Sequence, residues 1–253
     1  DPASQVYVRN KERAAAEVDM LGETVTLSAE ATQDELFALI ARLNGDVRIH
    51  GLLVQLPLPT QINENAVIEA INPEKDVDGL HPVNLGRLVR QEEGFWPCTP
   101  HGVLQILSRS GIDVKGKHAV VVGRSTLVGR PVANLLGHKA DGANATVTLC
   151  HTGTQDLGYF TRQADILIVA AGFPQGIKAD MVKEGAVVID VGINQIDDPS
   201  RERGWRLVGD VDYKEVRKKA SAITPVPNGI GPMTIALLLY NTVWSAKRKH
   251  GLE

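Results

Sequence analysis

The chain has 253 residues, a formal net charge of −3, 43% hydrophobic residues and 23% charged residues. This composition is that of an ordinary globular protein, and the length allows one large domain or, as we expect here, two smaller ones. The absence of a long basic run and of an apolar run of the ~18 residues that a membrane span requires argues against a nucleic-acid-binding or membrane protein. Cys98 and Cys150 lack CxxC spacing, which argues against a disulfide framework and a structural zinc site. With no recognisable signal peptide, we expect the reducing cytosol or a mitochondrial matrix.

The amino-terminal part of the chain predicts alternating helices and strands. The pattern indicates helices at 3–21, from Thr32 to about Leu43 and near 63–71, and strands at 23–28 and 51–56. Thr32 and Glu35 form a capping-box pattern at the start of the second helix. The second strand runs into prolines at Pro57 and Pro59, which cannot continue a central strand. A polar loop at 72–79, Asn-Pro-Glu-Lys-Asp-Val-Asp-Gly, follows the third helix.

The second part begins after a proline-containing segment at 94–100, which is typical of a domain crossover. A helix is expected at 101–108, and apolar strands are expected at 119–122, 145–150, 165–171 and 186–191. Near-continuous apolar runs of this length suit a parallel sheet that is covered on both faces. A loop rich in proline and glycine then spans 224–232 and precedes an apolar helix from Met233 to about Trp244.

The stretch 117–131, Lys-His-Ala-Val-Val-Val-Gly-Arg-Ser-Thr-Leu-Val-Gly-Arg-Pro, predicts a strand, a glycine turn and a helix. In parallel α/β sheets such a turn binds a nucleotide diphosphate, because glycine lets the backbone approach and the free N–H groups of the helix point at the phosphates. Gly123 and Gly129 stand six residues apart, so the usual GxGxxG fingerprint is not matched. A strand-to-helix turn without a ligand is the alternative interpretation.

The end of the second strand of this sheet bears on the choice of cofactor. An acid at that position usually binds the adenosine ribose of NAD, whereas NADP requires the position to be free of negative charge. Here the strand ends in Leu-Cys-His-Thr-Gly-Thr (149–154), without a carboxylate. His151, Thr152 and Arg124 could form a donor-rich pocket for a 2′-phosphate, which favours NADP. The alternatives are a solvated loop histidine at 151 and a surface ion pair at Arg124.

The amino-terminal part offers residues for acid–base chemistry and substrate binding. Tyr7 and Lys11 are four residues apart and therefore share one helix face. A lysine serves as acid or base when burial or neighbouring donors move its pKa toward neutrality, and Gln55 at a strand end could orient it. Asp78 could accept two hydrogen bonds from an amidine-like edge such as that of a pterin. A surface helix, a polar strand end and a turn-forming aspartate are the plain structural alternatives.

Other site classes find no support. The sequence contains neither a GxSxG elbow nor a GKS or GKT phosphate loop, and its seven histidines show no paired metal-ligand spacing. From the residues alone, the chain is expected to be an NADP-binding α/β protein with a second domain and without a catalytic metal.

Several segments together resemble one family. They are Tyr-Val-Arg-Asn-Lys (7–11), Gly-Leu-Leu-Val-Gln-Leu-Pro-Leu-Pro (51–59), Pro-Glu-Lys-Asp-Val-Asp-Gly (73–79), Pro-Cys-Thr-Pro (97–100), Val-Gly-Arg-Ser (122–125) and Pro-Val-Pro-Asn-Gly-Ile-Gly-Pro-Met-Thr (225–234). In this order and spacing they resemble the bifunctional methylenetetrahydrofolate dehydrogenase/cyclohydrolase family over essentially the whole chain. The resemblance implies two α/β domains with a cleft between them, the second a Rossmann-like doubly wound parallel sheet. Residues 1–98 and 233–253 would form the folate domain, and 99–232 the NADP-binding domain.

The resemblance also implies an activity. In one-carbon metabolism, 5,10-methylenetetrahydrofolate would be oxidised with NADP⁺ to the 5,10-methenyl cation, which water would open to 10-formyltetrahydrofolate, a donor for purine biosynthesis. Lys11 would be the catalytic lysine, Gln55 the residue that tunes it, Tyr7 the wall beside the folate and Asp78 the acid that binds the pterin. Further substrate contacts would come from Val54, Leu56, Pro227, Gly229, Gly231 and Pro232, and cofactor contacts from Gly123, Arg124, Ser125, His151, Thr152 and Ile193.

The resemblance carries three further expectations. A homodimer in the cytoplasm is expected, or in the mitochondrial matrix for a eukaryotic form. No formyltetrahydrofolate-synthetase extension is expected. The family has an additional helix and strand before the position of Asp1, and we expect that the sequence omits them rather than that the protein is truncated, because truncation would expose a sheet edge.

Three other functions compete with this prediction. They are a monofunctional dehydrogenase of the same family, a non-catalytic NADP-binding or regulatory module on the same fold, and an amino-acid or shikimate-type dehydrogenase. Lys11 with Tyr7 and Gln55 disfavours the first, and the presence of Lys11, Gln55 and Asp78 disfavours the second. A pterin-binding assay would separate the third.

Overall fold

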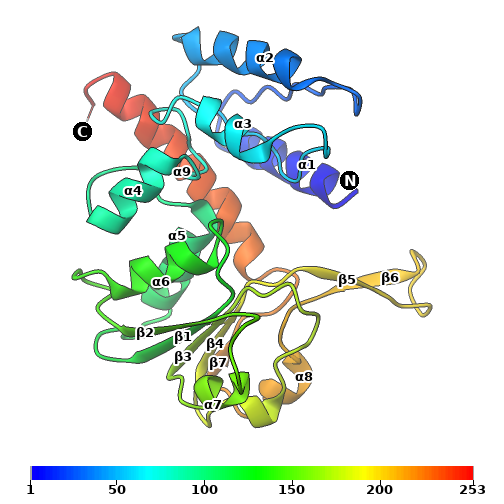
Figure 1. Cartoon of the computed structure of the whole chain (residues 1–253), viewed down its shortest axis with the longest axis vertical. Helices are drawn as coiled ribbons and strands as arrows, with labels where there is room; N and C mark the ends of the chain where they lie inside the picture. The colour runs from blue at the N-terminus through cyan, green and yellow to red at the C-terminus, as the bar shows by residue number, and fades with distance from the viewer. Residues whose placement is uncertain (1, 253) are drawn as a thin grey trace. The chain divides into compact units, whose positions relative to one another are not determined.

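The computed structural model describes the backbone of residues 2–252 and the side chains of residues 7–252. The chain forms two compact units, Asp1–Cys98 with Ile235–Glu253, and Thr99–Thr234. We call the first the helical unit and the second the sheet unit. The last helix, α9 (Ile230–Lys249), begins in the sheet unit and continues into the helical unit, as its unbroken ribbon in Figure 1 shows.

The sheet unit is built on a parallel sheet with the strand order β2-β1-β3-β4-β7 (Figure 1). The strands are β1 (His118–Val122), β2 (Thr146–Cys150), β3 (Ile166–Val169), β4 (Val187–Asp190) and β7 (Ala222–Ile223). In the central register, Ala119 lies opposite Val147 on one side and Ile166 on the other. The four strands expected at 119–122, 145–150, 165–171 and 186–191 are confirmed within a few residues. The α/β class and the parallel sheet are therefore confirmed.

Both faces of this sheet are buried under helices. The helices of the unit are α5 (Cys98–Arg109), α6 (Gly129–Gly137), α7 (Leu157–Thr161), the 3₁₀ turn η1 (Ala179–Met181) and α8 (Tyr213–Val216). Val121 and Ile168 face one apolar cluster with α5 and α6, whereas Val120 and Leu167 face a second cluster with α7 and α8. Neighbouring strand residues thus point to opposite faces and are buried on both, which explains the continuous apolar runs.

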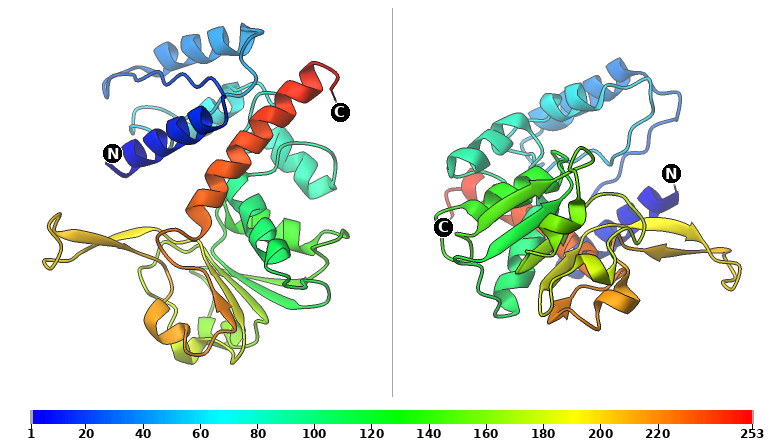
Figure 2. Two further views of the ribbon diagram at one scale, coloured as in Figure 1. Left: turned by 180° about the vertical axis from the view of Figure 1, so that it is seen from behind. Right: turned by 60° about the horizontal axis from the view of Figure 1, so that its bottom comes forward.

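A short antiparallel ribbon completes the sheet unit. It pairs β5 (Asn194–Asp197) with β6 (Trp205–Val208), with Asn194 opposite Val208. Both views in Figure 2 show the ribbon extending away from the five-stranded sheet. Because β5 follows β4 closely, the ribbon starts near the carboxyl end of a sheet strand.

The helical unit contains α1 (Pro2–Glu17), α2 (Gln33–Gly45), α3 (Glu64–Ala70), α4 (Pro82–Arg90) and the larger part of α9. The capping box predicted for α2 is confirmed: Thr32 Oγ1 accepts from the Glu35 N–H at 3.2 Å, and the Glu35 carboxylate accepts from the Thr32 N–H at 2.8 Å. Apolar side chains of α2, α3 and the adjoining loops share a core of Leu36, Ile40, Ile62, Val67 and Ile71.

The strands predicted at 23–28 and 51–56 are wrong. Leu52 forms a single parallel bridge with Asp76, in which the Leu52 N–H donates to the Lys75 carbonyl at 2.7 Å. Residues 23–28 are exposed and form no regular secondary structure, and no strand in the described part of the helical unit pairs with them. An alternating pattern predicts a face suited to pairing, but a strand forms only where a second backbone supplies the ladder.

Two helix starts also differ from expectation. The helix expected at 101 begins at Cys98, and the helix expected at Met233 begins at Ile230. Pro100 and Pro232 therefore lie in first turns, where a proline removes no hydrogen bond from the helix interior. Gly231 and Pro232 are consequently helical rather than part of the preceding loop. No helix among the described residues is long and apolar enough to cross a membrane.

Candidate functional site

Lys11 and Gln55 are joined directly. The Lys11 ammonium on α1 donates to the Gln55 side-chain oxygen at 3.0 Å, and the Gln55 amide nitrogen donates to the Leu56 carbonyl at 2.8 Å. The second bond assigns the two ends of the amide, so the oxygen faces the lysine. Val54, Gln55 and Leu56 are all partly buried in the segment that leads to Pro57. Gln55 therefore orients the ammonium group of Lys11.

Tyr7 and Asp78 complete the set that was expected in the amino-terminal part. Tyr7 is partly buried one helical turn before Lys11, and burial raises the pKa of its hydroxyl. Burial also raises the pKa of Asp78, the nearby charge of Asp76 adds to that rise, and the positive charge of Lys11 opposes it. The opposing effect means that Lys11 and Asp78 are close enough to interact electrostatically. The structure thus brings Lys11, Gln55 and Asp78 into one neighbourhood.

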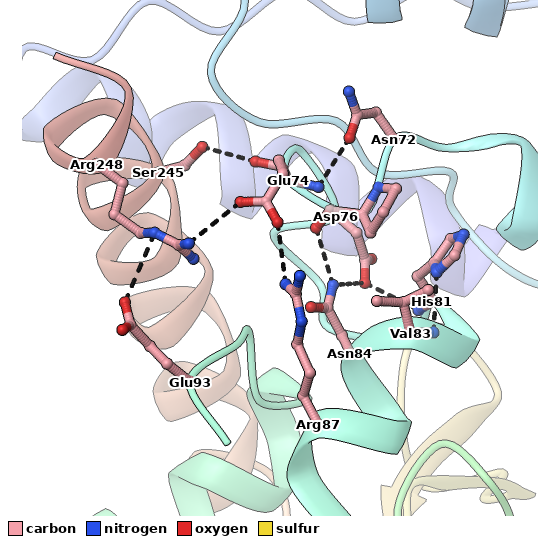
Figure 3. Close-up of polar contacts among 11 residues, drawn as sticks. Asn72, Glu74, Asp76, His81, Val83, Asn84, Arg87, Glu93, Ser245 and Arg248 are labelled. Atoms are coloured by element: carbon pink, nitrogen blue, oxygen red, sulfur yellow. Dashed lines mark hydrogen bonds and ion pairs between the residues drawn. The ribbon is translucent and has the colours of Figure 1, made fainter.

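The loop that carries Asp78 is held by buried polar side chains, several of which are drawn in Figure 3. Asp76 is 1% exposed and accepts from the His81 N–H and the Asn84 side-chain amide, each at 2.8 Å. The ammonium of Lys75 donates to three backbone carbonyls at 2.7–3.0 Å, those of Leu43, Asn44 and Asp46. Each bond ties the loop to a neighbouring segment, so the backbone that presents Asp78 is fixed from both sides.

The last helix of the chain supports the same loop. Asn241 on α9 is buried and donates to the Val77 carbonyl at 2.8 Å and to the Trp96 carbonyl at 3.3 Å. Ser245, one turn later, donates to the Glu74 carbonyl at 3.1 Å (Figure 3). Cys98 is buried, its thiol donates to the Val77 carbonyl, and burial raises the pKa of that thiol well above its usual value. Sequence patterns gave no signal for Asn241 or Ser245, since their partners lie far away in the chain.

The glycine turn of the sheet unit is packed without space for side chains. Gly123 has a φ of +118°, and a Cβ there would stand 2.0 Å from the Ala170 carbonyl oxygen. A Cβ on Gly129 would stand 2.0 Å from the Gly123 carbonyl oxygen. The Ser125 hydroxyl accepts from the Val128 N–H at 3.1 Å. A bare backbone at a strand-to-helix turn fits the close approach that a dinucleotide requires.

The expected cofactor residues lie at one edge of the sheet. Arg124 and Ser125 follow β1, His151 and Thr152 follow β2, and Ile193 follows β4; since these strands are parallel, their carboxyl ends meet at the same edge. Arg124, Ser125 and Thr152 are exposed, and Ile193 is 46% exposed. His151 Nδ1 accepts from the Gly153 N–H at 3.0 Å, so in the neutral ring the proton is on Nε2. This edge offers donors to a 2′-phosphate, as NADP requires.

The segment from Pro227 to Pro232 follows β7, whose carboxyl end lies at the same edge of the sheet. Pro227 and Pro232 are exposed, whereas Gly229 and Gly231 are partly buried. A Cβ on Gly229 would stand 2.3 Å from the Pro225 carbonyl oxygen, so this turn too is closely packed.

Two buried aspartates at this edge were not predicted from the sequence. Asp190 ends β4 and is 3% exposed, and Asp210 follows β6 and is 0% exposed. A carboxylate at the end of an apolar strand is the signal that could have found Asp190. Among the residues that the structure describes, no group of three histidine, cysteine, aspartate or glutamate side chains could hold a metal ion.

Known proteins share both the sequence and the fold. The model of the tetrahydrofolate dehydrogenase/cyclohydrolase catalytic domain matches residues 1–78, and that of the NAD(P)-binding domain of the same family matches residues 97–250. The bifunctional protein FolD of Chlorobium phaeovibrioides is 58% identical over 100% of this chain and 86% of the relative.

Solved structures agree with these matches. The bifunctional enzyme FolD of Campylobacter jejuni, a methylenetetrahydrofolate dehydrogenase/cyclohydrolase, is 52% identical with a TM-score of 0.91, covering 98% of this chain and 85% of that one. The FolD of Trypanosoma brucei, solved with NADP cofactor and an inhibitor, is 43% identical with a TM-score of 0.92, covering 98% and 84%. The chain belongs to the tetrahydrofolate dehydrogenase/cyclohydrolase family.

Proposed function

We propose that this chain oxidises 5,10-methylenetetrahydrofolate with NADP⁺ to the 5,10-methenyl cation and hydrolyses that cation to 10-formyltetrahydrofolate. Family models for both parts of the chain and bifunctional relatives of high identity support the two activities. The single observation that carries the hydrolytic activity is the 3.0 Å contact of Lys11 with Gln55, beside Asp78. A monofunctional dehydrogenase would have no use for this oriented lysine.

For the oxidation, the chain has to bind and orient two ligands. NADP⁺, when bound, supplies the nicotinamide ring that accepts the hydride. The turn from Gly123 to Ser125 would hold the pyrophosphate, Arg124, His151 and Thr152 would provide donors for the 2′-phosphate, and Ile193 would contact the cofactor. The folate nitrogens stabilise the cationic product, so orientation is the main contribution of the protein to this step.

For the hydrolysis, the chain has to move protons. Water attacks the one-carbon bridge and loses a proton, which leaves a hydroxyl group on that carbon. As the bond from the carbon to N5 breaks, N5 takes up a proton and the hydroxyl loses its proton to form the formyl C=O, so one proton is released overall. Lys11 is the residue that we assign to this transfer, with Gln55 holding its nitrogen in place. Asp78 accepts two hydrogen bonds from the pterin, and Tyr7 lies along one side of the folate. Val54, Leu56 and the segment 227–232 provide further substrate contacts.

Domain roles, assembly and location belong to the same proposal. The helical unit binds the folate and the sheet unit binds NADP, an assignment supported by the catalytic and NAD(P)-binding family models. We further propose a homodimer that works in the cytoplasm. Sedimentation analysis of the purified protein tests the dimer, and a single monomeric species would contradict it.

The experiment compares wild type with Lys11→Met, a substitution that keeps the length of the side chain and removes its amine. One assay supplies 5,10-methylenetetrahydrofolate with NADP⁺ and follows NADPH; the other follows absorbance of the preformed methenyl cation. We expect the variant to lose hydrolysis by about a hundredfold or more while it still binds NADP⁺. The matched control is Arg13→Met on the same helix, where the side chain is exposed and pairs with Glu17 at 3.5 Å.

The possible results have distinct meanings. Wild type that forms NADPH and hydrolyses the cation, with hydrolysis lost only in Lys11→Met, supports the full proposal. Normal hydrolysis by Lys11→Met would show that the enzyme uses another residue. Wild type without either activity would contradict the enzyme and favour a binding module.

A further inference from the structure

Asp210 has no role in the activity described so far, yet each of its two carboxylate oxygens accepts two hydrogen bonds. One oxygen accepts from the backbone N–H groups of Ala171 at 2.7 Å and Gly172 at 3.0 Å. The other accepts from the Phe173 N–H at 2.9 Å and from the Asn194 side-chain amide at 2.8 Å. Three of these donors lie in the loop after β3, and the fourth, Asn194, is the first residue of β5 at the end of the loop after β4; both loops follow the carboxyl ends of their strands.

The loop after β4 is held on both sides of Ile193. On one side is Gly192, where a Cβ would stand 2.3 Å from the Asp210 carboxyl carbon. On the other is Asn194, whose amide donates to the same carboxylate. The position of the 46% exposed Ile193 therefore depends on a carboxylate that its two chain neighbours contact.

Asp210 is itself held by the second buried aspartate. The Asp210 N–H donates to one oxygen of Asp190 at 3.0 Å, and the Val211 N–H donates to the other at 2.9 Å. The Gly192 N–H also donates to Asp190, at 3.0 Å. Asp190 thus connects the end of β4 to the segment that carries Asp210, so the two loops and their anchor form one hydrogen-bonded unit.

We infer that Asp210 is a positioning residue for the nicotinamide end of the cofactor site, because it sets the loops after β3 and β4 that present Phe173 and Ile193. This inference rests on the proposed function, in which Ile193 contacts NADP. The exposed apolar side chains Phe173 (62% exposed) and Ile193 offer a surface for a flat ring at the sheet edge where the cofactor residues meet. Both oxygens of the Asp210 carboxylate act as hydrogen-bond acceptors. A carboxamide has only one acceptor oxygen, so an asparagine at this position cannot make the same hydrogen bonds.

The experiment uses three variants of the full chain. Asp210→Asn replaces one acceptor oxygen with a donor, Asn194→Ala releases only the loop after β4, and Asp212→Asn is the matched control. Asp212 lies two residues along the same segment, and its carboxylate contacts the exposed Lys178 at 3.3 Å. For each protein, calorimetry measures the Kd of NADP⁺, steady-state assays separate kcat from the KM for NADP⁺, and the preformed methenyl cation measures hydrolysis, which uses no nucleotide.

We expect Asp210→Asn to raise the Kd and KM for NADP⁺ by about tenfold or more, since donors facing the new amide lose their acceptor. Asn194→Ala, which loses one of these bonds, should raise both by about threefold. Hydrolysis of the methenyl cation should stay within about twofold of wild type in both, a separation that general destabilisation would not produce. Asp212→Asn should match wild type.

Wild-type affinity for NADP⁺ in Asp210→Asn and Asn194→Ala would overturn the inference, and so would an equal loss of hydrolysis and of NADP⁺ binding in Asn194→Ala. If Asp210→Asn fails to fold, Asn194→Ala decides alone. Wild type that binds NADP⁺ but lacks both activities would contradict the proposed function. The Kd values of the variants for NADP⁺ would still test whether Asp210 positions the cofactor loops.

Discussion

The two units position their functional residues by different physical means. In the sheet unit, parallel strands with two buried faces place the glycine turn and the loops around it at one edge. In the helical unit, no sheet forms among the described residues, and the loop of Asp78 is held by Lys75, Asp76 and Asn241 through bonds to the backbone. Apolar burial is spread over many contacts, whereas a buried polar group depends on a few donors and acceptors. We therefore expect the sheet unit to be sensitive to lost volume and the helical unit to lost hydrogen bonds.

The largest effect should come from removing volume at the centre of the sheet. Leu167 in β3 is 0% exposed, and Leu167→Ala should cost between about 2 and 5 kcal/mol of unfolding free energy through the cavity that it leaves. The matched control is Leu149→Ala in β2, where the side chain is 36% exposed and the cost should be clearly smaller. Urea unfolding measures both, and equal costs would contradict the proposed dependence on burial.

The second effect tests the helical unit with a change that removes no volume. Asp76→Asn should cost about 2–3 kcal/mol, because a carboxylate that accepts from His81 and Asn84 is replaced by a group with one acceptor atom. Asp34→Asn, at an exposed position of α2, is the control and should be nearly neutral.

Activity assays extend this test. Because the Asp76 loop presents Asp78, methenyl hydrolysis by the folded Asp76→Asn protein should fall, while its Kd for NADP⁺ should stay near that of wild type. A normal rate of hydrolysis would mean that the loop keeps its position without the carboxylate.

The sequence predicted the sheet unit far better than the helical unit, for a physical reason. A parallel strand buried on both faces has its own composition, so the runs at 119–122 and 186–191 identified β1 and β4 without knowledge of their neighbours. The segment 23–28 had a strand-like pattern too, but pairing also requires a partner that local sequence does not reveal.

The same limit applies to the candidate site. Strand ends predicted Arg124, His151 and the glycine turn, since topology gathers strand ends at one edge. The residues alone left the joining of Lys11 to Gln55, 44 residues apart, open beside plain structural alternatives, and the family resemblance favoured it. Asn241 contacts Val77 across 164 residues and Asp210 contacts Phe173 across 37, and no local periodicity encodes such pairs.

The third effect is the pH dependence of the unfolding free energy that arises from Asp190, which binds the segment carrying Asp210. Burial raises the pKa of Asp190 to about 6, with the nearby charge of Asp210 adding to the rise and three backbone N–H donors opposing it. The folded protein therefore holds a proton that the unfolded chain releases near its ordinary value of 3.8. The associated stability is present below that value and is lost as the pH rises, with about 2 kcal/mol lost between pH 4 and pH 6.

Urea unfolding of wild type and Asp190→Asn across this range isolates the effect, because the other titrating groups are shared. The unfolding free energy of wild type should fall relative to that of the variant as the pH rises. The control is Asp180→Asn at an exposed position, which should track wild type. Parallel curves for wild type and Asp190→Asn would show that folding does not raise the pKa of Asp190.

The smallest effect separates buried polar groups from surface ion pairs in the helical unit. Arg248 on α9 reaches Glu74 at 3.4 Å and Glu93 at 3.6 Å, and Arg87 reaches Glu74 at 3.0 Å (Figure 3). The Glu93 side chain is 71% exposed, so Glu93→Gln should change the unfolding free energy by less than about 0.5 kcal/mol. Glu74→Gln, which weakens two pairs, should cost up to about 1 kcal/mol and less at high salt.

These ion pairs and the hydrogen bonds of Asp76 lie around the loop that carries Asp78. Comparing the costs of removing each therefore shows which kind of interaction holds this loop. A cost for Glu93→Gln or Glu74→Gln as large as that of Asp76→Asn would mean that surface charge holds the loop of Asp78. Buried hydrogen bonds predict the opposite ranking, because an exposed carboxylate that loses its partner is still solvated by water, whereas a buried donor that loses its acceptor is not.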